Sequence, residues 1–299
     1  GYKWDPVYFR VGTLDAARLG HGLILNYYTN EAHYDERKIG LSFDLDFGQF
    51  GFESVTSNLG RAEILGMRAY YRPLVNIINV PIIKNLAFGG TIVHDFDPDS
   101  WSGTDDAASA VGLDVELPLL KTGILTSMLY YDWAQLSGYS SIEDESRTFG
   151  SGTALGLMVS LGNLVGLIDI SAKLERRWLG EEFMPSFFDP FYEIYRYQVE
   201  NGMQLHKVDG LIGLGKTKGV FGELYGGLMG NKVRLLGMFS KLDDVKRSGA
   251  LHLSADAPDL IPTIAAHATY DKIAVEEVSD VFTLDNNSIA RVGVGYKIK

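Results

Sequence analysis

The stretch Ser288-Ile-Ala-Arg-Val-Gly-Val-Gly-Tyr-Lys-Ile-Lys299 carries the pattern that decides the fold. Side chains of a β-strand point alternately to its two faces. One face of this stretch is therefore wholly apolar or aromatic, and it carries Ala290, Val292, Val294, Tyr296 and Ile298. The other face carries only small and charged residues, namely Arg291, Gly293, Gly295 and Lys297. A soluble sheet can show this pattern once, so its recurrence elsewhere decides between a soluble and a membrane protein.

The same alternation recurs along most of the chain, most clearly over residues 39–47. Leu41 and Phe43 lie on the apolar face there, while Asp44 and Asp46 lie on the opposite face. A carboxylate facing a dry protein core costs several kcal/mol unless it is paired, whereas one facing a water-filled lumen costs little. The pattern therefore predicts an all-β fold, a transmembrane antiparallel up-and-down β-barrel of about 16–18 strands.

The predicted strands cover the whole chain as a single domain, residues 1–299. They are expected at 7–14, 22–30, 39–47, 50–57, 64–72, 86–95, 110–118, 124–133, 152–161, 166–176, 207–215, 220–230, 233–242, 250–257, 264–271 and 288–299. A further strand at 191–199 would make the count odd. Because a barrel with both termini on one side needs an even count, an odd one would place another strand before Gly1.

The amino-acid composition argues against several classes of function. The formal net charge is −11 and no Lys/Arg-rich run is present, which argues against a nucleic-acid partner. The absence of Cys excludes disulfides, thiolate chemistry and Cys-ligated metals, and we expect no cofactor. No apolar run approaches the roughly 18 residues that a membrane helix needs. The opening Gly1-Tyr-Lys-Trp is not a signal peptide, so we expect any such segment to have been removed or to lie upstream.

With dyad strands over nearly its whole length, the chain resembles bacterial outer-membrane β-barrels of the porin type. The resemblance implies transport across the outer membrane of a Gram-negative-type cell envelope, contact with lipid, and a homo-oligomer or envelope complex as possible assembly. It also implies that the barrel-assembly machinery reads the last strand as its C-terminal signal. That signal usually ends in an aromatic residue, whereas this chain ends Tyr296-Lys-Ile-Lys299.

The leading functional hypothesis is a channel for passive diffusion of small polar solutes or ions. The strand faces predict a lumen lined by Arg10, Asp44, Asp46, Glu53, Arg68, Arg72, Asp114, Glu116, Asp132, Asp169, Lys173, Glu175, Asp256 and Arg291. Acids outnumber bases in this set, which predicts a mild preference for cations. The alternatives are a non-conducting barrel that serves as an anchor or a subunit of a larger assembly, an outer-membrane hydrolase, and a soluble all-β protein.

Two motifs suggest ligand sites. Residues 210–217 match the phosphate-loop pattern, but the Gly-rich sequence after them favours a hairpin turn over the helix that a nucleotide site needs. Asp95, Asp97, Asp99 and Asp106 occupy positions 1, 3, 5 and 12 of a calcium-type loop, although Ser100 stands where Gly is expected. We interpret this run as a weak Ca²⁺ candidate or a solvated acidic loop.

The histidines and the aromatic stretch complete the candidates. His94 near Asp95 and His267 near Asp271 are the local pairs from which a hydrolase could be built, and the chain is expected not to be an enzyme. Residues 178–203 are the most aromatic part of the sequence. They could narrow the lumen, cap the outer mouth, bind sugars or another subunit, or form a packed external loop.

Overall fold

The computed structural model describes residues 7–14, 16–30, 38–61, 63–99, 106–164, 166–200, 203–261 and 264–296. Fourteen strands form one antiparallel sheet in which neighbours in the chain are neighbours in space, apart from the step from β9 to β12. The strands are β1 (Val7–Gly12), β2 (Gly40–Asp46), β3 (Phe50–Thr56), β4 (Ile64–Tyr71), β5 (Ala87–Asp95), β6 (Ala108–Lys121), β7 (Leu125–Ser140), β8 (Glu145–Leu164), β9 (Ile168–Leu179), β12 (Thr217–Leu228), β13 (Val233–Leu242), β14 (Gly249–Ile261), β15 (Ile264–Val275) and β16 (Ser288–Tyr296). The predicted all-β, up-and-down antiparallel architecture is confirmed.

Smaller elements lie in the connections. β10 (Tyr197–Glu200) and β11 (Met203–His206) pair only with each other. Two short α-helices, α1 (Pro81–Lys84) and α2 (Tyr192–Tyr195), and two 3₁₀ helices, η1 (Lys207–Leu211) and η2 (Val278–Phe282), complete the described elements. None of the helices in the described part of the chain has the length and apolarity needed to cross a bilayer.

The sheet has fewer strands than the predicted sixteen to eighteen because three predicted strands are not sheet strands. Residues 22–30 form no strand, residues 207–211 form η1, and the 191–199 segment is interrupted by α2. In residues 22–30 the apolar side chains of Leu23, Ile24 and Leu25 are all buried, so burial there does not follow strand alternation. The count of fourteen is even, as the barrel hypothesis requires.

The chain divides into two compact units. Unit 1 comprises residues 1–117, 131–154 and 179–216, and unit 2 comprises residues 118–130, 155–178 and 217–299. The strand order begins with β1 and ends with β16, and it records no ladder from β16 back to β1 within the described residues. Closure of the sheet therefore stays a prediction, as does the single domain. Lys297–Lys299 and Gly1–Pro6 lie outside the described residues.

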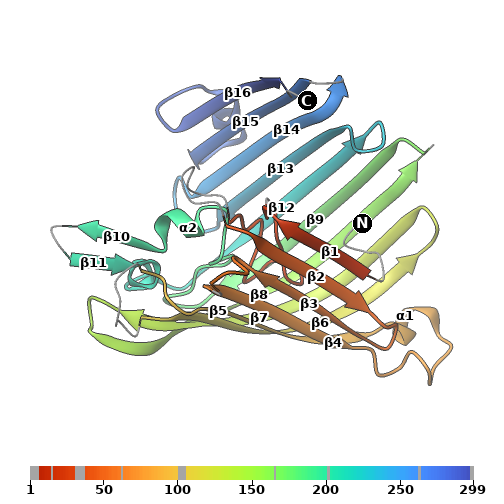
Figure 1. The fold of residues 1–299 in the computed structure, drawn as a ribbon, viewed down its shortest axis with the longest axis horizontal. Helices are drawn as coiled ribbons and strands as arrows, with labels where there is room; N and C mark the ends of the chain where they lie inside the picture. The colour runs from red at the N-terminus through yellow and green to blue at the C-terminus, as the bar shows by residue number, and fades with distance from the viewer. Residues whose placement is uncertain are drawn as a thin grey trace. The chain divides into compact units, whose positions relative to one another are not determined.

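In unit 1 the two faces of the sheet are inverted relative to a soluble protein. β1 to β5 lie side by side (Figure 1), and the apolar side chains of Val7 and Phe9 are 59% and 63% exposed. On β6 the Leu113 side chain is 63% exposed, whereas Asp114, the next residue, is buried. The charged face of these strands is thus the buried face, and the apolar face is open.

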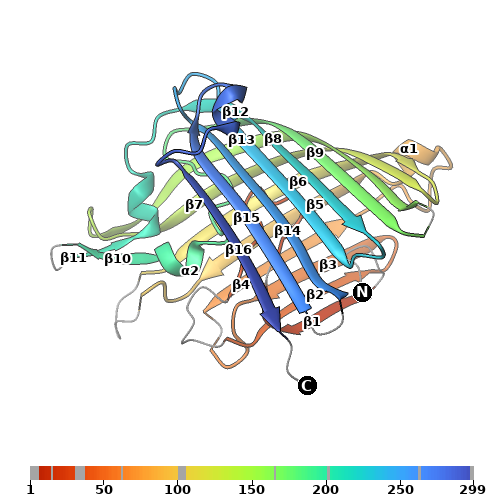
Figure 2. The same ribbon diagram turned by 90° about the horizontal axis from the view of Figure 1, so that it is seen from above.

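The same inversion continues in unit 2. On β9 the Leu174 side chain is 64% exposed between the buried Lys173 and Glu175. β12 to β16 follow as neighbouring antiparallel strands (Figure 2). β15 and β16 are paired in register from Ile264 opposite Tyr296 to Lys272 opposite Ser288. In β16 the side chains of both faces are largely exposed, including Arg291 and Val292.

Connections differ in length along the chain. The connections after β1, β5 and β9 are long, whereas β2–β3, β6–β7 and β8–β9 are joined by tight turns. The expected alternation of short and long connections is not complete, because the β4–β5 connection is long and holds α1, and the β7–β8 connection is short.

Candidate functional site

An irregular segment, residues 16–30, packs against the buried face of the unit 1 sheet; we call it the inner segment. The side chains of Leu19, Leu25 and Tyr28 are buried. A Cβ atom on Gly66 of β4 would come within 2.6 Å of the Leu19 Cδ1 atom, and a Cβ on Gly112 of β6 within 2.7 Å of Ile24 Cδ1. Glycine at these two strand positions therefore makes room for the inner segment.

The aromatic stretch packs onto the inner segment. The Asn26 N–H donates to the Phe188 carbonyl at 3.0 Å, and the Phe188 N–H donates to the Ile24 carbonyl at 3.1 Å. Phe187, Phe188 and Tyr192 are almost completely buried. Part of this stretch is therefore packed inside unit 1, whereas Phe191 and Tyr195 are about half exposed, and the role of the stretch stays a prediction.

Arg68, in the middle of β4, is the centre of a buried charge network. Its Nη1 atom lies 2.6 Å from Glu53 Oε1, and Glu53 stands directly opposite it on β3. Its Nε and Nη2 atoms donate to the two oxygens of Asp114 at 2.9 and 2.5 Å, and Nη2 also donates to Glu116 Oε1 at 2.5 Å. A guanidinium has the planar fork that such two-point pairing needs.

Gly89 lets this pairing cross an intervening strand. Arg68 belongs to β4 and Asp114 to β6, so β5 runs between them. Gly89 of β5 is in register with Asp114, and a Cβ atom built on it would lie 2.3 Å from an Asp114 carboxylate oxygen. The missing side chain leaves the space in which the Asp114 carboxylate lies.

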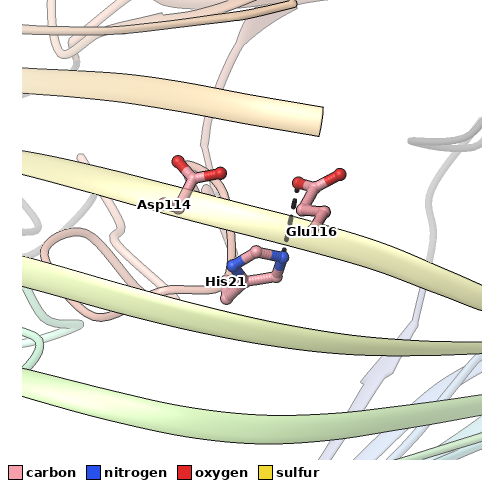
Figure 3. A group of neighbouring side chains, drawn as sticks. All are labelled: His21, Asp114 and Glu116. Carbon is pink, nitrogen blue, oxygen red and sulfur yellow. Dashed lines mark ion pairs between the residues drawn. The ribbon is translucent and has the colours of Figure 1, made fainter. Parts of the chain in front are cut away.

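His21 joins the inner segment to the network (Figure 3). Its Nδ1 atom lies 2.8 Å from Asp132 Oδ1, and its Nε2 atom lies 3.4 Å from Glu116 Oε1. Burial lowers the pKa of His21, but the carboxylates of Asp132 and Glu116 raise it more, to about 9. His21 is therefore protonated at neutral pH. The Gly20 N–H adds a further bond from the inner segment, to Glu53 Oε2 at 3.1 Å.

His21, Asp114 and Glu116 also have the composition of a metal site, since their donor atoms lie within 4.8 Å of one another. The guanidinium of Arg68 binds Asp114 and Glu116 directly, however, and its positive charge occupies the place of a cation. The arrangement is an ion-pair network. The cavity beside it, lined by Leu19, His21 and Trp133 among others, measures only 20 Å³, room for about one water molecule.

A second buried network lies in unit 2. Glu175 of β9 accepts from the Tyr130 hydroxyl at 2.6 Å and lies 2.6 Å from Arg177 Nη2 and 3.2 Å from Lys173 Nζ. The Arg177 guanidinium and the Lys173 ammonium lie 4.1 and 4.8 Å from the centre of the Phe221 ring. Arg177 was not among the predicted lining residues, although extending the alternation of Lys173 and Glu175 by two positions would have found it.

Several of the other predicted lining residues form ordinary pairs, and the rest are placed by their ladder positions. The Nη1 and Nη2 atoms of Arg72 donate to the two carboxylate oxygens of Asp46 at 2.7 and 3.0 Å. Asn231 Nδ2 donates to Asp169 Oδ2 at 3.4 Å. Asp256 lies 2.5 Å from His267. Asp44 is buried opposite Glu53, Arg10 stands opposite Ser42, and Arg291 stands opposite Thr269. In unit 1 Glu53, Asp114 and Asp132 face Arg68 and the inner segment, and the lining of a lumen by the predicted residues stays a prediction.

The four aspartates of the calcium-type loop have different partners in the described part of the chain. The Tyr192 hydroxyl donates to Asp95 at 3.0 Å, and the Arg196 guanidinium also contacts Asp95, while Arg61 pairs with Asp97. Asp99 and Asp106 instead face His206. The reason is that side chains distant in sequence, which loop spacing does not reveal, take up the carboxylates of Asp95 and Asp97. Residues 100–105 lie outside the described part of the chain.

The remaining motifs are also accounted for. The phosphate-loop match leads into the strand β12 and not into the helix that a nucleotide site needs. The hairpin interpretation is wrong as well, because the 3₁₀ helix η1, and not a strand, precedes β12. His94 Nδ1 lies 2.6 Å from Ser109 Oγ. Asp271 lies beside His252, at 2.7 Å, and not beside His267 as the sequence suggested.

Comparisons with known proteins found structural similarity and no similar sequence. No protein-family model matches the chain, and no curated protein matches it. Among solved structures it is similar to a TodX deltaS2S3 mutant, a monoaromatic hydrocarbon channel, with 8% identity and a TM-score of 0.31. That alignment covers 97% of this chain and 77% of the other.

Proposed function

We propose that this protein is an outer-membrane β-barrel through which small polar solutes or ions diffuse, with the inner segment narrowing the route. The observation that carries the proposal is the inversion of the sheet, in which Phe9 and Leu113 are exposed while Arg68 and Asp114 are buried. Exposing a continuous apolar sheet face to water is unfavourable, whereas exposing it to lipid is favourable.

The number of strands supports a lumen that is too wide for the strand side chains alone to fill. A barrel of eight strands is filled by its own side chains, and one of sixteen to eighteen leaves an aqueous channel. Fourteen strands fall between these cases. In unit 1 the buried face carries the inner segment and the aromatic residues Phe187 and Phe188, which take the space that water would otherwise fill.

Charge supports a weak preference for cations. The unit 1 network contains four carboxylates, of Glu53, Asp114, Glu116 and Asp132, against the two positive groups of Arg68 and His21. The net negative charge favours cations that approach it.

A second function, a non-conducting barrel that serves as an anchor or an envelope subunit, is favoured by the tight packing beside His21 and its 20 Å³ cavity. Planar-bilayer recordings distinguish the two. We expect discrete conductance steps and a reversal potential of cation-preferring sign in a salt gradient. Inserted protein that carries no current would establish the non-conducting barrel instead.

The role of the inner segment can be tested with two introduced cysteines. The chain has no Cys of its own that could form a competing disulfide. A pair of cysteines at Leu19 and Gly66 would tie the inner segment to β4 when oxidised. We expect oxidation to lower the conductance and a reducing agent to restore it. Equal conductance in both redox states, with the disulfide verified by mass, would show that the route does not depend on movement of this segment.

A further inference from the structure

Apart from the Arg68 network, two aspartate side chains and one histidine side chain from distant parts of the unit 1 sequence lie close together. Asp99 follows β5, Asp106 precedes β6, and His206 ends β11. His206 Nε2 lies 3.3 Å from Asp106 Oδ2 and 4.0 Å from Asp99 Oδ2. All three donor atoms lie within 4.8 Å of one another, and all three residues are buried.

The donor atoms of two of these residues lack hydrogen bonds. Neither carboxylate oxygen of Asp106 nor the Nε2 atom of His206 has a hydrogen-bond partner among the described residues. Asp106 is only 1% exposed and His206 7% exposed, so bulk water does not solvate them. Polar atoms buried without a partner are unfavourable, which points to a missing ligand at this position.

The imidazole is held in the orientation that a metal ligand needs. His206 Nδ1 lies 3.0 Å from the Ser141 hydroxyl, and the His206 backbone N–H donates to Asp209 Oδ2 at 2.8 Å. Asp209 is itself fixed, because its Oδ1 accepts from the Ser140 hydroxyl at 2.7 Å. When Nδ1–H donates to the Ser141 hydroxyl, the Nε2 lone pair is directed at the carboxylates, which is the arrangement of many metal-binding histidines.

We propose that Asp99, Asp106 and His206 bind a divalent transition-metal ion of the Zn²⁺ type. Ligand atoms of a tetrahedral Zn²⁺ stand about 3.4 Å apart for metal–ligand bonds of about 2.1 Å, close to the 3.3 Å between His206 and Asp106. The imidazole nitrogen favours Zn²⁺ over Ca²⁺, which prefers oxygen donors.

Charge and topology support the assignment. Asp99 and Asp106 bring two buried carboxylates beside one imidazole, so a cation between them would offset their mutual repulsion. In the other cluster, by contrast, Arg68 supplies the positive charge. A bound ion would link the β5–β6 connection to the end of β11. It would thereby also restrain the aromatic stretch, which precedes β11 and packs onto the inner segment.

The test is metal binding by the full chain, untagged, folded in detergent and freed of metal with a chelator. We expect titration calorimetry with ZnCl₂ to show one ion bound per chain, and His206→Gln or Asp106→Asn to abolish that binding. His252→Gln is the matched control, since His252 also faces a carboxylate, Asp271, at 2.7 Å, but both side chains of that pair are about one-third exposed. It should keep the full stoichiometry.

Two further measurements remain informative if a ligand variant misfolds. Ser141→Ala keeps all three ligands and should weaken binding by about 10- to 100-fold, as loss of a hydrogen bond to a ligating histidine does. Co²⁺ added to the unaltered protein should give the visible absorption of a tetrahedral site. A chain that binds no Zn²⁺, that binds Ca²⁺ in its place, or whose His206→Gln variant binds Zn²⁺ unchanged would overturn the proposal.

Discussion

Arg68 and Asp114 form a two-point ion pair, at 2.9 and 2.5 Å, although the strand β5 runs between the strands that carry them. The pair exists because Gly89 of β5 leaves room for the Asp114 carboxylate. Because of this pair, the charged face of these strands forms a buried ion-pair network where an open barrel would have a water-filled lumen. His21 of the inner segment joins the same network through Glu116.

Gly89→Ala should disrupt this pair, whereas Gly90→Ala should not. A Cβ on Gly89 would meet the Asp114 carboxylate at 2.3 Å, while one on Gly90 would stand 3.9 Å from Leu113. Forcing an atom into a filled space typically costs about 1–3 kcal/mol. Urea unfolding of the protein in lipid vesicles would compare the two variants, and equal stabilities would contradict the proposed role of Gly89.

Stability should depend on pH through His21. The pKa of His21 is raised to about 9 in the folded protein from an ordinary 6.5, because Asp132 and Glu116 favour the protonated form. Its contribution is therefore fully present below pH 6.5 and is lost as pH rises toward 9. The largest expected loss is about 3 kcal/mol. Unfolding midpoints between pH 6 and 10 would show it, and a His21→Gln variant with the same decline would assign it to another group.

Leu113→Arg should block membrane assembly, although Leu113 is 63% exposed. On a lipid-facing strand an Arg near the bilayer midplane costs about 2–4 kcal/mol, while on a water-facing strand it costs almost nothing. Leu113→Phe is the apolar control and should fold normally. The readout is the fraction of refolded protein that floats with lipid vesicles. Unimpaired insertion of the Arg variant would indicate that this face does not meet lipid.

The neighbouring residues Arg176 and Arg177 should respond oppositely to substitution. Arg177 is buried against Glu175 and Phe221, so Arg177→Met leaves a buried carboxylate with less compensation and should destabilise by about 3 kcal/mol. Arg176 forms a surface pair with Asp243, and pairs of that kind contribute about 0–1 kcal/mol. Thermal unfolding of Arg177→Met and Arg176→Met in detergent tests this. A larger loss of stability for Arg176→Met would contradict the assignment of Arg177 to the buried face and Arg176 to the exposed face.

Strand periodicity was enough to predict the sheet and its faces. Alternation places Phe43 and Asp44 on opposite faces whatever the rest of the chain does, because it is a local property of extended backbone. The prediction therefore held for β2 and β9, and it held for the antiparallel order that short turns impose. It failed at residues 22–30, whose run of Leu23, Ile24 and Leu25 is buried on all sides in contact with a segment more than 150 residues away, at Phe188.

The sequence by itself thus determined an all-β sheet with one apolar and one charged face, since these follow from neighbouring residues. Only the tertiary structure decided what the charged face meets. Arg68 reaches Asp114 across β5, His21 reaches Asp132, and His206 reaches Asp106, each over tens to about a hundred residues of chain. Such pairings depend on strand order, register and the space left by glycines such as Gly89, and no local pattern encodes them.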